Sequence, residues 1–383
     1  MSNALEPIAF SRPYMDEAEV NAAAGTIRSH WIVGGPRLEE FEKEFAALCG
    51  AKHAVGVSSW TTGAFLVLHA WGIGPGDEVI VPSLTFIASV NVIVHSGATP
   101  VFADIDPQTW NIDPAEVQRK ITRRTKAIMP VDQIGLPCDI DSINEIACRS
   151  GVRVLEDAAC SFASRNHGRP IGSLADVTVF SLHARKIISS GEGGMITTDD
   201  SRFAERLRRL RHQGMSISDH ARHSASSALF ESYPEVGYNF RLTDIQAAIG
   251  LAQLSKLDEI LDRRRRIADR YTDYLADHPL LAPPVVPAGL THNWQSYMVR
   301  LRDNYGRDRS AVLTWLFERG VPSRRGVMAS HLEEPYRAMA ARLPNTEAVA
   351  ASTVQLPIHP ALTIRQQDYI FEVLTELGTT CGG

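Results

Sequence analysis

The fold of this chain is decided by two stretches of sequence, VRVLEDAAC at 152–160 and VTVFSLHARK at 177–186. Each begins with a short, β-rich apolar run and then turns polar, at Asp157 in the first stretch and at Ser181 in the second. Such runs predict strands, and open α/β sheets bind ligands at the carboxyl ends of their strands, where the connecting loops converge. We therefore expect both polar positions to belong to a binding site.

The same alternation of strand and helix extends from about residue 52 to residue 200. Its periodicity predicts strands at 78–81, 99–103, 127–131, 152–156, 177–180 and 195–198, and helices at 64–70, 89–95, 114–120 and 140–149. Strands separated by helices imply right-handed crossovers and a largely parallel sheet. This part of the chain is therefore predicted to be an α/β domain.

The pattern changes beyond residue 241. Apolar residues at helical spacing predict one long helix over 243–275, with Thr243 as its N-cap. A proline cluster at 279–287 then precedes a predicted strand at 295–301.

A chain of 383 residues is long enough for two domains. We expect a large α/β domain over residues 1–250 and a smaller α+β domain over 251–383, reached through the long helix. The polar segment 216–232 is predicted to be a flexible loop and is a candidate border of the active site.

Composition narrows the class of protein. Hydrophobic residues make up 44% of the chain and charged residues 22%, which is typical of soluble globular proteins. The formal net charge of -5 gives no overall attraction for nucleic acid or for an anionic membrane surface. The arginine run at 263–266 does not alter this, because four consecutive residues spread around most of a helical turn and form no single basic stripe.

The cysteines and the N-terminal sequence bear on localisation. The five cysteines are scattered and include no CxxC pair, so we expect neither a metal site nor a disulfide framework. The N-terminus lacks a basic region followed by an apolar stretch, and no apolar run is long enough to span a bilayer. The sequence therefore predicts a cytoplasmic protein with free thiols.

Lys186 carries the clearest chemical signal. It lies between a predicted strand end and the glycine-rich turn Gly191-Glu192-Gly193-Gly194. A lysine held in this way can be buried, lose its proton and attack an aldehyde to form a Schiff base. The alternative is an ordinary solvated lysine.

Asp157 supplies a possible partner for that chemistry. A carboxylate at a strand end can cap a helix or pair with a positively charged ring nitrogen. Because Lys186 follows two crossovers later, we favour the pairing, in which the acid keeps a pyridinium ring an electron sink while the lysine carries the ring as an imine.

The segment SSWTTG at 58–63 is a candidate phosphate cradle. It supplies hydroxyls and free amides just before the helix predicted to begin near residue 64, and helix N-termini bind anions. The alternative is an ordinary capped helix start. Ser181 can add a hydroxyl to the same phosphate. Phe86 follows the strand at 78–81 and either stacks on an aromatic cofactor or belongs to the core.

The chain as a whole resembles the pyridoxal-phosphate-dependent nucleotide-sugar aminotransferases of the DegT/StrS group. The motifs that carry the resemblance extend over nearly the whole sequence: W-x-x-G-G-P-x-x-x-x-F-E-x-x-F from Trp31 to Phe45, GIGPGDEVI at 72–80, GATPVF at 97–102, EDAA at 156–159, the Lys186 segment and GYNFRL at 237–242.

The resemblance implies an aspartate-aminotransferase-like fold, known as fold type I, with a mainly parallel seven-stranded sheet and a smaller C-terminal α+β domain. It also implies that Lys186 forms the Schiff base with pyridoxal 5'-phosphate (PLP), that Asp157 pairs with the pyridine nitrogen and that Phe86 stacks on the ring. His183, beside the lysine, is included among the cofactor-binding residues, although it can equally be a loop histidine.

The phosphate contacts follow from the same resemblance. Thr61, Thr62 and Ser181 would hold the phosphate, and Asn239 would reach the phosphate of the neighbouring subunit's cofactor. The expected working unit is therefore a homodimer with shared active sites.

The chain departs from the family pattern at four positions. Cys160 stands where relatives often have Gln or His near the ring hydroxyl, and Asp132 and Ile134 stand where His and an aromatic residue are frequent. Trp60 replaces the glycine often found before the phosphate threonine. These changes bear on substrate shape more than on the central chemistry, because Lys186 is intact.

The expected reaction is amino transfer. An amino donor, L-glutamate in this interpretation, would displace Lys186 and leave the cofactor as pyridoxamine 5'-phosphate, which would then aminate a keto group of a nucleotide-linked sugar. Candidate contacts for the sugar diphosphate are Arg241, Arg324 and Arg325, and His331 is a candidate neighbour of the sugar. The alternative for the two consecutive arginines is a solvent-facing turn.

Three other functions stay open at the level of sequence. The first is a PLP-dependent sugar dehydratase or lyase, although relatives that dehydrate sugars have histidine in place of the lysine. The second is an aminotransferase whose acceptor is a keto cyclitol. The third is a regulatory protein that has kept the fold and lost turnover.

Overall fold

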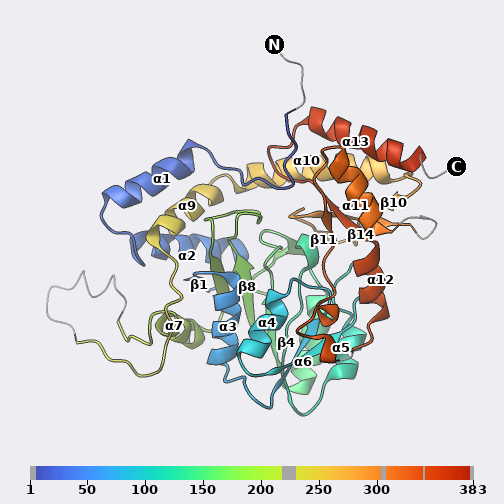
Figure 1. The fold of residues 1–383 in the computed structure, drawn as a ribbon. Coiled ribbons are helices and arrows are strands. Elements are labelled where there is room, and N and C mark those ends of the chain that lie inside the picture. Colours follow the sequence, from blue (N-terminus) through green and yellow to red (C-terminus); the bar gives the residue numbers. More distant parts are fainter. Residues whose placement is uncertain (1–5, 218–229, 303–307, 340, 380–383) are drawn as a thin grey trace.

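A seven-stranded sheet forms the centre of the computed structural model, which describes residues 6–217, 230–302, 308–339 and 341–379 (Figure 1). In spatial order the strands are β1 (His53–Val57), β9 (Gly194–Thr198), β8 (Val177–Ser181), β5 (Arg153–Asp157), β4 (Thr125–Ile128), β2 (Glu78–Pro82) and β3 (Thr99–Ala103). Every neighbouring pair is parallel except those of β9, which is antiparallel to both β1 and β8. The prediction of a mainly parallel seven-stranded sheet is confirmed.

Helices cover both faces of this sheet. One face packs against α3 (Trp60–Ala70), α4 (Ala88–His95) and α7 (Ser201–Leu210), and the other against α2 (Pro36–Cys49), α5 (Pro114–Lys120), α6 (Ile140–Ser150) and α9 (Asp244–Leu254). Successive side chains of a strand point to opposite faces, so Val79 and Val81 enter the first core and Ile80 enters the second. Burial on both faces explains why these strands read as continuous apolar runs.

The long helix predicted over 243–275 is two helices, α9 and α10 (Leu257–Leu275), separated at Ser255 and Lys256. The N-cap prediction is confirmed, because the hydroxyl of Thr243 accepts from the amide of Gln246. At the break, Ser255 Oγ donates to the Ala252 carbonyl, and Lys256 Nζ lies 2.7 Å from a carboxylate oxygen of Glu19 in α1 (Glu17–Arg28). The ion pair between Lys256 and Glu19 thus lies at the break between α9 and α10, and the spacing of apolar residues does not predict this break.

A second, antiparallel sheet follows in the order β10 (Leu281–Ala282), β12 (Tyr297–Leu301), β14 (Thr353–Leu356) and β13 (Arg324–Arg325). It shares a core with α10, α11 (Arg309–Glu318) and α13 (Ile364–Thr379), and α12 (Pro344–Ser352) leads into β14. Figure 1 shows α10 and α13 together above the large sheet. This C-terminal part is α+β, as expected, whereas the boundary at residue 250 stays a prediction.

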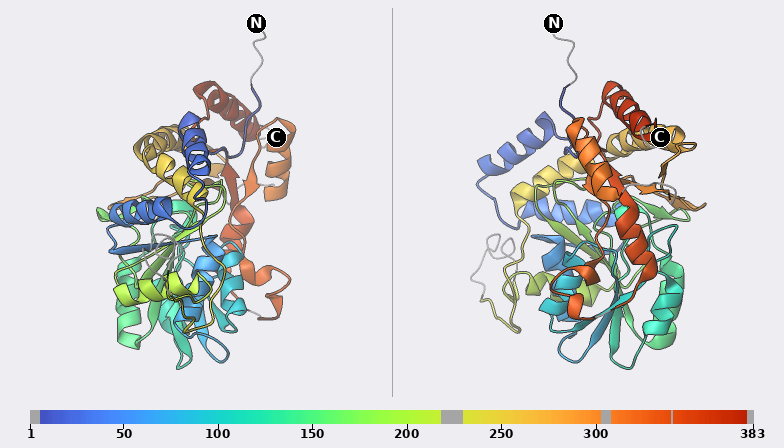
Figure 2. Two further views of the ribbon diagram at one scale, coloured as in Figure 1. Left: turned by 90° about the vertical axis from the view of Figure 1, so that its left-hand side faces the viewer. Right: turned by 45° about the vertical axis from the view of Figure 1, so that its right-hand side comes forward.

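The N-terminal segment joins the two parts of the molecule. Ile8 packs against the C-terminal core, and His359 Nε2 lies 3.2 Å from the Ala9 carbonyl oxygen. Both views of Figure 2 show this segment running beside the C-terminal helices before α1 begins. The start of the chain therefore packs with its end.

The remaining short elements lie in the connections. They are β6 (Arg165–Asn166), β7 (Arg169–Pro170) and β11 (Leu290–Thr291), which form a small sheet, and the 3-10 turns η1 (Gln133–Gly135), η2 (Ser330–Leu332) and η3 (Arg337–Met339). No helix within the described ranges has the length and apolar character needed to cross a membrane. Most of the loop predicted at 216–232 lies outside the described residues.

Candidate active site

The carboxyl edge of the large sheet brings the predicted site together. Strand register aligns Gly194 with Val57 on one side and with Ser181 on the other, and it aligns Asp157 with Val179. The loop after β1, the end of β8 and the end of β5 therefore meet at one edge.

Asp157 is buried at this edge as the last residue of β5. Its Oδ2 accepts a 2.7 Å hydrogen bond from Ser89 Oγ, and its Oδ1 accepts one of 3.1 Å from the amide of Ala159. Burial raises the pKa of Asp157 to about 6, against the lowering effects of the Ser89 and Ala159 hydrogen bonds and of the Lys186 charge. No helix follows Asp157 directly, so the helix-capping alternative does not apply.

Lys186 is partly buried in the loop between β8 and β9. Its Nζ donates a hydrogen bond to Cys160 Sγ at 3.2 Å. Backbone hydrogen bonds from Leu182 to Gly193 and from Ala184 to Gly191 close the loop on itself. The amine is therefore held inside the site, unlike a freely solvated lysine.

His183 belongs to the same loop. Its Nδ1 accepts from the Arg185 amide at 3.2 Å, and its Nε2 lies 3.9 Å from Glu192 Oε1. Burial is the main cause that lowers the pKa of His183. These contacts fit the loop-histidine alternative, and its role as a cofactor contact stays a prediction.

The candidate phosphate cradle differs from the prediction in one respect. The helix α3 begins at Trp60 and not near residue 64, so Thr61 and Thr62 form its first turn. Ser59 and Thr62 make a reciprocal capping box, which is the ordinary capped helix start considered above. The hydroxyl of Thr61 has no hydrogen bond within the described part of the chain, and it lies at the positive end of the helix dipole.

Two further contacts fix the position of this cradle. The indole of Trp60 is buried and donates to the Val179 carbonyl at 3.1 Å. A Cβ at Gly194 would lie 2.6 Å from the backbone carbon and oxygen of Ser59, so only glycine permits this approach between β9 and the cradle.

Phe86 does not belong to the core. Its side chain is 64% exposed, although the backbone beside it is anchored by the Thr85 amide, which donates to the Met328 carbonyl at 3.3 Å. An exposed aromatic ring on an anchored loop is available for stacking on a planar ligand.

The C-terminal part of the chain supports the site through two side chains that sequence reasoning missed. Asn293 Nδ2 donates to the carbonyls of Cys160 and Phe162 at 2.7 and 2.9 Å. Gln295 Nε2 donates to the Arg185 carbonyl at 2.8 Å. Both the Cys160 loop and the Lys186 loop are thereby tied to the segment that leads into β12.

The segment with Asn239 and Arg241 lies beside the end of β1. Arg241 pairs with Val57, and the Ser58 amide donates to the Phe240 carbonyl at 2.8 Å. Asn239 is exposed, whereas Arg241 Nη1 lies 2.7 Å from His212 Nδ1. The Arg241 side chain lines a cavity of about 370 Å³ between α2 and α7.

The other candidate substrate residues lie apart from Lys186 in the sequence and differ in exposure. Arg324 and Arg325 are exposed in β13, not in a turn, and Arg325 Nη2 lies 3.2 Å from Glu333 Oε1. His331 is 3% exposed, and its Nδ1 lies 2.7 Å from Ser83 Oγ. Contact of these three residues with a sugar nucleotide stays a prediction.

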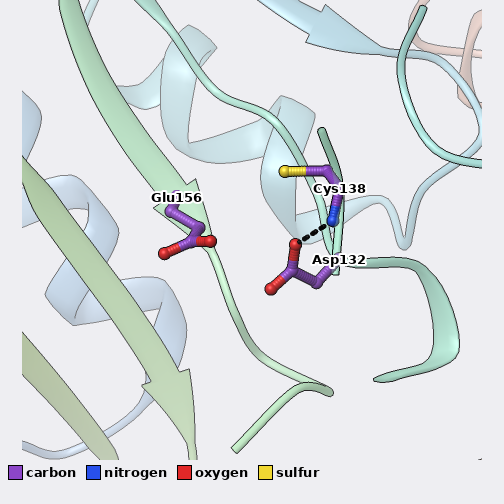
Figure 3. Close-up of side chains that lie close together, drawn as sticks. All are labelled: Asp132, Cys138 and Glu156. Carbon is purple, nitrogen blue, oxygen red and sulfur yellow. Dashed lines mark hydrogen bonds between the residues drawn. The ribbon is translucent and has the colours of Figure 1, made fainter. Parts of the chain in front are cut away.

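Three buried residues, Asp132, Cys138 and Glu156, form a cluster close to Asp157. Asp132, Cys138 and Glu156 have ligand atoms within 4.8 Å of one another, and the Cys138 amide donates to Asp132 Oδ1 at 2.8 Å (Figure 3). Burial raises the pKa of Asp132 to about 6 and that of Glu156 well above its usual range. The charge of Asp132 adds to the rise in the pKa of Glu156, because ionisation of one of two adjacent buried carboxyl groups disfavours ionisation of the other.

These features fit PLP. The buried Asp157 suits the ring nitrogen, and Lys186 suits the aldehyde. The exposed ring of Phe86 suits the face of the cofactor ring, and the N-terminus of α3 at Thr61 suits the phosphate. Together with the mainly parallel sheet, they are the features expected of a PLP-dependent enzyme of fold type I.

Comparison with known proteins agrees with this assignment to the PLP-dependent enzymes. The model of the DegT/DnrJ/EryC1/StrS aminotransferase family matches residues 13–375, and the chain belongs to this family. It is 41% identical over 377 residues to GDP-perosamine synthase of Caulobacter vibrioides, covering 97% of this chain and 99% of the relative. It is also 39% identical over 374 residues to the spore coat polysaccharide biosynthesis protein SpsC of Bacillus subtilis, covering 96% of each.

The solved structures give the same fold. The protein Spr1654 of Streptococcus pneumoniae has been solved in a PLP form and a PMP form, which match this chain with TM-scores of 0.91 and 0.92 at 28% and 29% identity. Each match covers 98% of this chain and 100% of the other.

Proposed function

We propose that this aminotransferase moves an amino group from L-glutamate to a keto group of a nucleotide-linked sugar. The observation that carries the proposal is the Lys186 amine, which is held 3.2 Å from Cys160 Sγ and whose charge offsets part of the rise that burial causes in the pKa of Asp157. The sugar acceptor is supported by the similarity to GDP-perosamine synthase and to a polysaccharide biosynthesis protein.

Each part of the site has a role in holding PLP. Asp157 would pair with the ring nitrogen, Phe86 would stack on the ring, and the first turn of α3 with Ser181 would hold the phosphate. When bound, PLP supplies an electron sink that stabilises negative charge at a carbon attached to its imine nitrogen, and it alternates between aldehyde and amine forms.

Lys186 has two successive roles in this proposal. Its Nζ first anchors the cofactor, and after the donor has displaced it the same nitrogen takes the proton from the donor's α-carbon. Hydrogen bonds from Ser89 and the Ala159 amide oppose the rise that burial causes in the pKa of Asp157, and so favour the charged carboxylate and a protonated ring nitrogen opposite it.

The working unit in this proposal is a cytoplasmic homodimer. Asn239 is exposed at the edge formed by β1, which is compatible with contact to a neighbouring subunit's phosphate. Arg241, Arg324, Arg325 and His331 remain the proposed neighbours of the sugar nucleotide, because cations are suited to a diphosphate.

The proposal is tested by reducing the purified, PLP-treated protein with borohydride and mapping its peptides. We expect a pyridoxyl group on Lys186 and its loss in Lys186→Ala, whereas Lys126→Ala, which changes an exposed lysine, should leave the adduct in place. The protein is then converted to its pyridoxamine phosphate form, and nucleotide keto sugars are added one at a time. The sugar that restores the absorbance of lysine-bound PLP is the acceptor. A wild-type protein without an adduct on Lys186 would disprove the proposal.

A further inference from the structure

The cysteines of this protein have very different surroundings. Of the four that the structure describes, Cys49 and Cys138 are buried, and burial raises the pKa of each thiol well above its usual range. Cys148 is exposed, and Cys160 is partly exposed. Because the thiolate is the reactive form, the first two are inert and the other two are open to oxidants.

Cys160 differs from Cys148 in having an amine as its neighbour. Its sulfur lies 3.2 Å from Lys186 Nζ, at hydrogen-bond distance. The backbone on either side of this pair is fixed by the C-terminal segment, since Asn293 holds the Cys160 carbonyl and Gln295 holds the Arg185 carbonyl. Sulfur and nitrogen are thus kept together by contacts that need no cofactor.

We propose that Cys160 and Lys186 form a reversible sulfur–nitrogen bond when a peroxide oxidises the thiol. Hydrogen peroxide gives one oxygen atom to the sulfur, so that the thiol becomes a sulfenic acid and the peroxide becomes water. The unprotonated Lys186 amine then attacks the sulfur, the S–O bond breaks, and a second water leaves. The product has an S–N bond and two hydrogen atoms fewer than the thiol and amine together.

The bond has a direct consequence for the site. It occupies the nitrogen that would otherwise bind PLP, so an oxidised, cofactor-free subunit cannot be loaded until a thiol reductant cleaves the bond. Conversely, a lysine already bound to PLP cannot attack the sulfenic acid. This consequence rests on the proposed role of Lys186, whereas formation of the bond does not.

The experiment exposes the full-length protein to hydrogen peroxide, with and without saturating PLP, and maps its peptides without reductant. In the cofactor-free sample we expect the peptides of Cys160 and Lys186 to be joined, with a mass two hydrogen atoms below their sum. Dithiothreitol should separate them. Cys160→Ser should abolish the joined peptide, while Cys148→Ser should retain it, and circular dichroism checks that both variants are folded.

The outcomes separate the two proposals. If Cys160 is oxidised to sulfinic acid, or stays reduced while Cys148 reacts, and no joined peptide appears, the bond is disproved. If the joined peptide forms equally with and without PLP, the bond stands and the role of Lys186 as cofactor anchor fails. Formation of the bond in the cofactor-free sample and protection by PLP support both.

Discussion

Ser89 donates a 2.7 Å hydrogen bond to Asp157, and its own hydroxyl oxygen lies 2.8 Å from Thr85 Oγ1. Since the single hydroxyl proton of Ser89 goes to the carboxylate, Thr85 must be the donor to Ser89. The loop next to Phe86 and the buried acid of β5 are thereby connected through one side chain. The proposed stacking of Phe86 on the ring and the proposed pairing of Asp157 with the ring nitrogen are consequently linked through Ser89.

Ser89→Ala should weaken PLP binding by roughly ten-fold or more, because a hydrogen bond to a charged group contributes about 1.5–3 kcal/mol. Without it the pKa of Asp157 rises further and less of the carboxylate is charged. Titration of the cofactor by absorbance measures the effect. Ser96→Ala, which removes a hydroxyl at the other end of α4, is the control, and equal affinities in the two variants would contradict the prediction.

Gly194→Ala should lower both the affinity for PLP and the melting temperature. The added methyl group would lie 2.6 Å from the backbone of Ser59 and would displace the start of α3. Gly25→Ala is the matched control, because its Cβ meets no atom within 4 Å and alanine favours the interior of α1 by about 1 kcal/mol. Cofactor titration and thermal unfolding measure the two effects. A Gly194 variant with wild-type affinity would show that the close approach is unimportant for the cradle.

Asp132→Asn should remove a pH-dependent cost of roughly 3 kcal/mol from the cofactor-free protein at neutral pH, since a pKa raised from 3.8 to about 6 penalises the folded state above that range. Well below pH 3.8 the carboxyl group is protonated in both states and contributes nothing. As the pH rises from about 4 to about 6, the unfolded chain releases the proton first, so the wild type loses stability relative to the variant. Above about 6 the difference is constant.

This pH dependence is measured as the difference in the free energy of unfolding between Asp132→Asn and the wild type. The difference removes the opposite contribution of His292 and His359, whose pKa values burial lowers to about 3 and about 4. Asp258→Asn, at an exposed position, is the control for removal of one negative charge. A flat difference for Asp132→Asn would mean that its carboxyl group titrates normally.

Lys186→Ala and Asn239→Ala should complement each other if the active sites are shared between subunits. Each variant alone should be impaired, but a hybrid dimer contains one site with both changes and one with neither. The two proteins are unfolded together in equal amounts and refolded. About half of the dimers should then be hybrids, each with one intact site out of two, so we expect up to about a quarter of wild-type activity. Mixing without subunit exchange is the control, and an Asn239 that acts within its own subunit would give no recovery.

The parts of the fold that the sequence predicts well are those with a local cause. The strand ending at Asp157 and the helix at 114–120 follow from apolar periodicity and a capping residue, and α5 has the predicted bounds. The helix α3 begins four residues before its predicted start, because its capping box ends in Thr62 in place of the more usual Glu or Gln. The position of β1 was not predicted, since its pairing with β9 depends on residues far along the chain.

The supporting residues of the site could not be found by local reasoning. Ser89 contacts a residue 68 positions away, and Asn293 and Gln295 contact residues 133 and 110 positions away. A serine at a helix start or an amide in a loop has no periodicity or spacing that indicates such a partner. By contrast, Lys186 and Asp157 stand at strand ends, where the topology of α/β sheets itself gathers functional groups.

The reversed direction of β9 has a consequence for how this site can change. Because β9 is antiparallel to β8, the chain leaves the sheet edge at Ser181 and returns to the same edge at Gly194. Lys186 therefore lies in a loop that connects two adjacent antiparallel strands, and the chain does not cross to the opposite edge of the sheet between them. A change of length within 183–192 would therefore move the reactive amine without changing the register of β8 and β9, but it would also have to accommodate Ile187 and Ile188, which are buried in the core shared with α2 and α9.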